Sequence, residues 1–383
     1  MSNSETPTRA SAELEARLEQ TEESVAQFDK DDKTVIAILR GFLRDHPTMI
    51  PALVVIISVL AFGIVAPRFM TTGTLSLVLQ QVTVTGFIAL AQTVVILTAG
   101  IDLSVGEMLL LSSLVMGNLA VNTHIPLFIQ NLIPSWLSPF LGIGPEGLVP
   151  VGLAIVIGIG VGTLLGMFNG VLVAKMKLPP FIVTLGTLSI YRALKLAYSH
   201  SESIRNVDIE AKANGLLFFG NNFKVLGATV TFGMIMLVVM AGIMWFVLNR
   251  TAWGRHVHAL GDDPEAAMLS GIAVDRTLIS VYTVAGLICG FTAWVAIGRV
   301  KSISPIGFET INLDSITAVV IGGTSLFGGR GSIVGSVLGA IIVGVFITGL
   351  SLAGVDSYWQ TFATGCLVII AVALDQYLRR ASK

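Results

Sequence analysis

The sequence is poor in charge and in cysteine. Charged residues make up 12% of its 383 residues, roughly half of the about 25% that a soluble domain carries. Hydrophobic residues make up 54% and stand in long runs, which argues against a soluble enzyme, a disordered chain and a disulfide-stapled scaffold. The two cysteines, Cys289 and Cys366, are far apart in apolar runs. This placement is typical of buried thiols and of neither a disulfide framework nor a metal site.

The sequence also has no excess of positive charge. The chain has 23 Lys and Arg against 24 Asp and Glu, a formal net charge of −1. Proteins that bind nucleic acid display a basic patch or stripe, so we expect no nucleic-acid partner. The five histidines lack the spacing of metal ligands, and no nucleophile–base arrangement stands out. We therefore expect no metal site and no catalytic residue.

What the sequence does have is a series of ten apolar segments. A helix that spans a membrane needs about 20 predominantly apolar residues, because each adds 1.5 Å against a hydrocarbon core of about 30 Å. We predict an all-α polytopic membrane protein with about ten transmembrane helices. The segments cover roughly residues 48–66, 77–98, 105–122, 149–173, 179–198, 229–248, 277–297, 313–327, 332–353 and 358–376.

The distribution of Lys and Arg predicts that both termini are cytoplasmic. An even number of spans puts both ends on one side of the membrane. With the termini inside, the inner joints hold more Lys and Arg than the outer ones, as the positive-inside rule requires. The loop 123–148, which is outside in this orientation, has no Lys or Arg.

Charge separates a polar tail from the apolar body. Residues 1–40 hold 9 acids and 5 Lys and Arg. We predict that residues 1–45 form a cytoplasmic tail and that residues 46–383 form the transmembrane domain. Within the tail, the apolar residues of 35–43 have the i, i+3, i+4, i+7 spacing of a helix that lies in the membrane interface. A continuation of the first span fits the same pattern.

A polar break separates the second and third apolar segments. It reads Thr98-Ala-Gly-Ile-Asp-Leu-Ser-Val-Gly-Glu107. Ser104 and Glu107 have the spacing of a capping box, in which each side chain bonds the other residue's backbone N–H. A broken helix at membrane depth is tolerated where it lines a cavity. The break is therefore either a helix cap or part of a transport pathway.

Few charges lie within the predicted spans. The carboxylates Asp102, Glu107, Asp314 and Asp375 stand near span ends, and we find no Lys, Arg or His in mid-span to pair with them. Carriers driven by H⁺ or Na⁺ usually use deeper ionisable groups. This pattern weighs against such a carrier without excluding it.

The fourth apolar segment carries glycines at every fourth residue. These are Gly158, Gly162, Gly166 and Gly170. Glycines at this spacing line one helix face and let another backbone approach closely. We predict that the face packs within a dense helical bundle, a place in the transport pathway being the alternative.

The loop 249–276 contains the pattern of a short, self-capped helix. Asp263 can cap it, Pro264 can be its first residue, and Gly271 can follow its end. Two turns are too few for stability alone, so this helix must dock, either on its own bundle or on a partner protein. Its apolar Ala266, Met268 and Leu269 would suit a groove.

A glycine-rich joint, 322–331, overlaps the end of the eighth segment and leads to the ninth. It lacks the lysine of a phosphate-binding loop, and no strand precedes it. We expect a tight turn there and no nucleotide site.

Four segments together resemble the membrane permease of the ribose/galactose/xylose class of bacterial ABC importers. They occur in the family's order, and the resemblance covers about residues 50–378. The segments are Thr98 to Gly106; Phe168-Asn-Gly170 with Leu178 to Gly186; Gly254 to Gly261 with its continuation to Ile272; and Leu313 to Gly331.

The resemblance implies an assembly in the bacterial inner membrane. It implies a homodimer of permeases, two cytoplasmic ATPase subunits and a periplasmic sugar-binding protein. ATP would bind to the partner subunits, and this chain would bind no cofactor. The resemblance also implies that the short helix docks into the ATPase. The coupling residues would be Gly261, Asp263, Glu265, Ala266, Ala267 and Gly271.

We therefore predict the permease subunit of an ATP-driven importer that moves a monosaccharide, a ribose-like pentose or a hexose, into the cytoplasm by alternating access. Because a sugar is neutral and rich in hydroxyls, its pathway needs hydrogen-bonding groups more than charge. The candidates are Gln92, Asp102, Ser104, Asn169 and Thr184, with Phe181 as an apolar gate. Alternatives are an importer for another small polyol or signalling sugar, an ion-coupled secondary carrier, and a membrane receptor that binds through loop 199–228.

Overall fold

The computed structural model describes residues 48–124 and 149–381. The predicted tail 1–45, its interfacial helix 35–43 and most of loop 123–148 fall outside these residues, as does the side chain of Asp375. The compact unit considered below spans Ile50–Lys383.

Each of the ten predicted apolar segments contains a helix. These helices are α3 (Met49–Val65), α4 (Thr72–Leu97), α5 (Val105–Val121), α8 (Val151–Lys175), α9 (Pro180–Ser199), α11 (Phe232–Arg250), α14 (Val274–Val300), α15 (Ile311–Ile321), α16 (Ile333–Leu352) and α17 (Ser357–Ala381). The eighth is shorter than the predicted segment 313–327, because it ends at Ile321, where the glycine-rich joint 322–331 begins.

The composition of these helices confirms a helical polytopic membrane protein. Among the described residues, α4, α8, α11, α14 and α16 are long and apolar enough to cross a membrane. Three others, α3, α5 and α15, are apolar but shorter. The number of crossings, ten, and the cytoplasmic side of the termini stay predictions.

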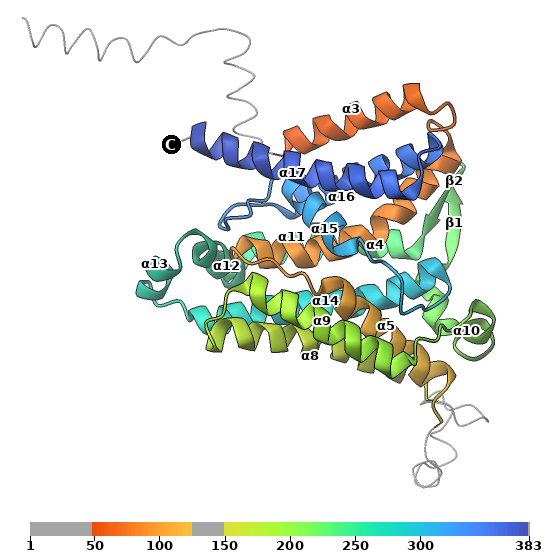
Figure 1. Ribbon diagram of the computed structural model, residues 1–383, viewed down its shortest axis with the longest axis horizontal. Coiled ribbons are helices and arrows are strands. Elements are labelled where there is room, and N and C mark those ends of the chain that lie inside the picture. The colour runs from red at the N-terminus through yellow and green to blue at the C-terminus, as the bar shows by residue number, and fades with distance from the viewer. Residues whose placement is uncertain (1–47, 125–148, 382–383) are drawn as a thin grey trace, which may run out of the picture. The chain divides into compact units, whose positions relative to one another are not determined.

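Helix α4 lies at the centre of the bundle. Its C-terminal half is buried on every side, from Val82 to Leu97. It packs against α14, α15 and α16, and it runs through the middle of the view in Figure 1. A helix that is apolar all round is one that neighbours enclose, which explains the even hydrophobicity of this segment.

The glycine face of α8 lies against α14. A Cβ atom at Gly162 or Gly166 would meet backbone atoms of α14, and those atoms belong to Gly286, Gly290 and Tyr282. Glycine on both helices therefore brings the two backbones together. Gly158 faces α5 in the same way, and Gly170 faces Ile279 and Tyr282 of α14.

Short elements cap the two ends of the bundle. At one end lie α12 (Ala252–Asp262) and α13 (Pro264–Leu269), on the left of Figure 1. At the other end lie α10 (Asn206–Lys212) and an antiparallel hairpin of β1 (Asn222–Val225) and β2 (Ala228–Thr231), in which Asn222 pairs with Thr231. A 3₁₀ helix, η2 (Asn214–Gly220), joins α10 to β1.

Candidate functional site

The break between α4 and α5 is held by a buried carboxylate. We call residues 98–104 the polar joint. Within it, Asp102 Oδ1 accepts hydrogen bonds from the Ser104 backbone N–H at 2.8 Å and from Ser104 Oγ at 2.6 Å. The predicted capping box is wrong: Ser104 makes no side-chain cap bond to α5. The serine O–H donates to the carboxylate instead, and the serine oxygen accepts from Asn169 Nδ2.

Side chains from α8 and α9 extend this network. Asn169 Nδ2 donates to Ser104 Oγ at 2.9 Å and lies 3.4 Å from Asp102 Oδ2. The hydroxyl of Tyr191 donates to Asn169 Oδ1 at 3.0 Å. Tyr191 was absent from the predicted site, although a tyrosine in mid-span signals a hydroxyl that needs a partner.

Two more predicted residues reach the backbone of the polar joint. Thr184 Oγ1 donates to the Ile101 carbonyl at 3.0 Å, and Gln92 Nε2 donates to the Asp102 carbonyl. The structure thus brings all five polar candidates together. All five are completely buried within the chain, so a place in the pathway would require the network to open. Phe181 lies apart from it, half-exposed on α9.

A buried ion pair joins α5 to α9 beside the polar joint. Lys195 Nζ lies 2.6 Å from Glu107 Oε2, and Arg192 Nε lies 3.4 Å from Glu107 Oε1. The side chain of Lys195 is only 4% exposed, whereas that of Arg192 is 53% exposed. The inference that no basic side chain pairs with the carboxylates of the spans is therefore wrong. Glu107 needs this partner because an unpaired buried charge is costly.

The short helix α13 begins and ends at the capping residues that the sequence predicts. Asp263 Oδ1 accepts from the N–H groups of Glu265 and Ala266, at 2.9 and 3.0 Å. Pro264 is its first residue. Gly271 follows it with φ +85°, in the left-handed region that favours glycine.

The outer surface of α13 is apolar. Ala267 packs inward, but Met268 is 61% exposed and Leu269 is 85% exposed. Glu265 and Ala266 are exposed beside them. The helix thus presents two exposed apolar side chains next to a carboxylate.

Helix α12 connects α13 to the polar joint. A Cβ atom at Gly261 would meet the carbonyl oxygen of Leu97, the last residue of α4, and would lie 2.6 Å from the Gly329 nitrogen. The N–H of Gly329 in turn donates to the Leu97 carbonyl at 2.9 Å. His258 Nδ1 lies 3.0 Å from the Gly329 carbonyl oxygen. The end of α4, the α12–α13 pair and the turn 322–331 are therefore in direct contact.

The glycine-rich joint 322–331 is a turn between α15 and α16, as expected. Gly323, Gly328 and Gly329 adopt positive φ angles of +88°, +83° and +73°. These values require glycine or strain any other residue.

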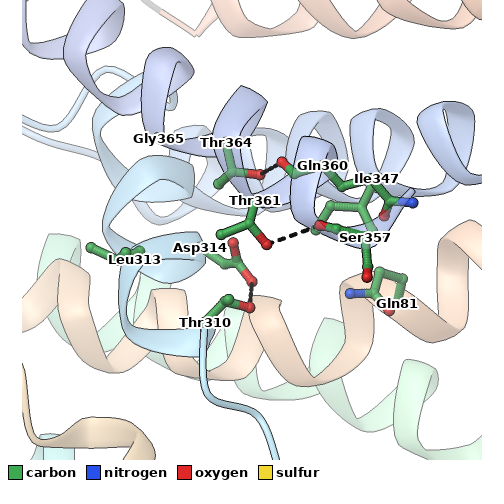
Figure 2. A pocket seen from close by; sticks show the side chains of 10 residues that line it. All are labelled: Gln81, Thr310, Leu313, Asp314, Ile347, Ser357, Gln360, Thr361, Thr364 and Gly365. Atoms are coloured by element: carbon green, nitrogen blue, oxygen red, sulfur yellow. Dashed lines mark hydrogen bonds between the residues drawn. The ribbon is translucent and has the colours of Figure 1, made fainter. Parts of the chain in front are cut away.

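A polar cavity of 220 Å³ lies between α4, α15, α16 and α17 (Figure 2). We call it the α15–α17 cavity. It is lined by Gln81, Thr310, Leu313, Asp314, Ile347, Ser357, Gln360, Thr361, Thr364 and Gly365. A neighbouring cavity of 230 Å³ shares Gln81, Ile347 and Gln360 with it and adds Arg299. The sequence drew attention to Asp314 alone, as a charge at a span end, because the other polar residues stand singly on separate helices.

The family profile described as Branched-chain amino acid transport system / permease component matches residues 74–372. The chain belongs to this family. The matched residues include the polar joint, α12, α13 and the whole lining of the α15–α17 cavity. Together with the apolar helices, the family membership makes this permease component a multi-pass protein of the inner membrane.

Curated relatives are permeases of sugar importers, which confirms the resemblance. The fructose import permease of Rhizobium meliloti is 46% identical over 383 residues, covering all of both chains. The ribose import permease of Bacillus subtilis is 37% identical over 85% of this chain and 92% of its own. The galactose/methyl galactoside import permease of Escherichia coli is 32% identical over 86% of this chain and 94% of its own. No solved structure matches the chain.

Proposed function

We propose that this chain is the transmembrane subunit of an ATP-driven ABC importer that carries a monosaccharide from the periplasm to the cytoplasm. The relatives that it matches over most of their length are sugar import permeases. The structural observation that carries the proposal is α13, a self-capped helix with an exposed apolar surface that packs, through α12, on the end of α4.

The proposed assembly has the composition that the resemblance implies. Two copies of this chain form a homodimer, two ATPase subunits bind at the cytoplasmic face, and a periplasmic binding protein delivers the sugar. ATP binds to the ATPase, and the permease holds no cofactor. In this orientation α12 and α13 face the cytoplasm, and α10 and the hairpin face the periplasm.

The contacts of α12 suggest how ATP hydrolysis moves the spans. When the ATPase shifts α13, the motion passes through Gly261 to the carbonyl of Leu97 and so to the end of α4. The contact is backbone against backbone, and close-packed interiors transmit displacement because they have little free volume. The polar joint directly follows Leu97. A shift there would loosen the hydrogen bonds of Asp102 and expose the five buried candidates to the pathway.

Fructose is the first sugar to test, because the full-length relative is a fructose permease. A ribose-like pentose is the second, and another small polyol or signalling sugar is the alternative cargo. A carrier driven by H⁺ or Na⁺ is a separate hypothesis. It requires gradient-driven uptake by this chain alone in vesicles, without ATPase subunits.

The docking role of α13 is tested by charging its most exposed apolar residue. Leu269→Asp should abolish co-purification of the ATPase and sugar uptake, because the buried face of an interface does not accept an unpaired charge. The matched control is Leu226→Asp. Leu226 is 97% exposed at the tip of the hairpin, at the opposite end of the bundle, and its replacement should leave the ATPase bound.

A second substitution separates docking from coupling. Glu265→Arg reverses the charge of α13 beside the same surface, and it should reduce uptake. If uptake survives Glu265→Arg with the ATPase still bound, and Leu269→Asp also leaves the complex intact, α13 does not receive the ATPase.

A further inference from the structure

The α15–α17 cavity has hydrogen-bonding groups that the protein itself does not use. Asp314 is 4% exposed and lies at the start of α15, where Thr310 Oγ1 donates to its Oδ2 at 2.9 Å. Within the described part of the chain, its Oδ1 is left to accept from another donor. Figure 2 shows this carboxylate between α15 and α17, facing the cavity.

Each glutamine of the cavity forms a hydrogen bond to the protein with only one of its two amide groups. Gln81 Oε1 accepts from Arg299 Nη2 at 2.6 Å, which fixes the amide and leaves Nε2 as a donor. Gln360 Nε2 donates to the Val355 carbonyl at 2.7 Å, which leaves Oε1 as an acceptor. Their amide orientations are thus set by protein partners, and the remaining groups are presented to a ligand.

The hydroxyls of α17 also remain able to accept. Thr361 Oγ1 donates to the Ser357 carbonyl at 3.1 Å, and Thr364 Oγ1 donates to the Gln360 carbonyl at 3.0 Å. Each hydroxyl donates its only hydrogen to a backbone carbonyl, and its oxygen can still accept a hydrogen bond. The lining therefore offers acceptors at one carboxylate, one amide oxygen and two threonine hydroxyls, and donors at the Gln81 amide, the second hydrogen of Gln360 Nε2 and the Ser357 hydroxyl.

Donors and acceptors beside one buried carboxylate fit a ligand whose groups both donate and accept and that carries no negative charge. A sugar provides several hydroxyl hydrogens and is neutral. Leu313 and Ile347 add apolar surface for the C–H face of a sugar ring. The volume of 220 Å³ is far above the roughly 10–15 Å³ that a single water needs.

We propose that the α15–α17 cavity is a binding site for a neutral polyhydroxylated molecule, a monosaccharide, which occupies it before it crosses the membrane. This inference rests on the proposed function. The residues of the cavity stand at the first turns of α15 and α17, near the end of α16 and near the start of α4. In the proposed orientation these are the periplasmic ends, where the sugar arrives.

The site can be tested by thiol labelling of the full chain in lipid nanodiscs. Cys366 is replaced by serine, and Thr361→Cys is labelled with a charged thiol reagent in the presence and absence of fructose, ribose or mannitol. We expect at least one of these compounds to slow labelling several-fold. Tyr358→Cys, on the same helix but outside the lining, is the control and should react at one rate throughout.

Two further comparisons identify the group responsible. Gluconate carries a sugar's hydroxyls and a carboxylate, so it should not protect Thr361→Cys while Asp314 is present. In the assembled importer, Asp314→Asn should raise the apparent KM for sugar about tenfold, the size of one hydrogen bond to a charged group. The matched control, Asp356→Asn, removes an exposed carboxylate outside the lining and should leave the KM unchanged.

The outcomes separate this inference from the proposed function. If the importer moves sugar but no sugar or polyol protects Thr361→Cys, the cavity is not a sugar site and the transport function stands. If protection occurs but the assembled complex imports none of these sugars, the site stands and the proposed function fails.

Discussion

The polar joint and the α15–α17 cavity contain similar side chains in opposite situations. Both have a buried aspartate with amide and hydroxyl neighbours: Asp102 with Asn169 and Ser104, and Asp314 with Gln81 and Thr310. In the joint, the aspartate binds only groups of the protein and is fully buried. In the cavity, one carboxylate oxygen and several acceptors face open volume.

The difference shows what a polar cluster within a membrane protein does. A backbone that leaves the helical ladder must find partners for its N–H and C=O groups, because lipid offers none. The joint uses its polar side chains for that purpose. In the cavity, Gln360, Thr361 and Thr364 also donate to backbone carbonyls, but each keeps acceptor capacity that is available to a ligand.

Helix α4 carries one member of each cluster. Gln81 and Gln92 are 11 residues apart, about 16 Å along the helix and three turns, so they lie on nearly the same face. A sugar that binds in the cavity would have to move roughly this distance to reach the joint. The two clusters therefore lie along nearly the same side of α4, three turns apart.

The largest expected effect is on the stability of the joint. Asp102→Ala removes the acceptor for Ser104 and Asn169 and leaves their donors buried, which should destabilise the protein by about 4 kcal/mol. Thermal unfolding of the purified chain would show a lower midpoint. An unchanged midpoint together with a raised KM for sugar would mean that Asp102 binds sugar, as is proposed for Asp314, and that the joint has no separate structural role.

The ion pair that flanks the joint should have the next largest effect. Lys195→Met leaves Glu107 with Arg192 alone, at 3.4 Å and half-exposed, and should cost about 3 kcal/mol. The double variant Glu107→Leu with Lys195→Met should recover most of this loss, because it removes both charges. If the double variant unfolds as early as the single one, the pair does not act through charge.

The smallest effect on stability is expected in the cavity. Thr364→Val keeps the shape of the side chain and should change the free energy of unfolding by less than about 0.5 kcal/mol. It removes an acceptor from the lining, so the apparent KM for sugar should rise about threefold. A fall in the unfolding midpoint as large as that of Asp102→Ala would place Thr364 in the packed core instead.

Much of the fold follows from hydropathy, and the ends of α13 follow from its capping residues. All ten apolar segments contain helices, since length and apolar content decide what a bilayer accepts. Asp263, Pro264 and Gly271 predict α13 because capping is a local interaction. Helix α12 was missed: it is short and carries four polar residues among eleven. It packs against the end of α4 through Gly261, a contact that no local pattern contains.

The site was harder to predict because its partners are distant in sequence. The three-residue spacing of Ser104 and Glu107 predicted a capping box, yet both side chains bind other partners, Ser104 to Asp102 and Glu107 to Lys195 of α9. Single polar residues such as Gln81 and Gln360 give no signal until four helices bring them together. Motif residues identified the polar joint from the sequence. Only the packed structure shows that the joint is filled by protein groups and that the α15–α17 cavity is open.

The central claim is that the chain is a transport component moved by a separate ATPase that docks on α13. The most direct test is ATP hydrolysis in lipid, measured for the permease alone and for the complete complex with sugar-loaded binding protein. The account predicts no hydrolysis by the permease alone, hydrolysis stimulated by sugar in the complex, and loss of that stimulation in Leu269→Asp. Hydrolysis by the purified permease, or full stimulation of the Leu269→Asp complex, would contradict it.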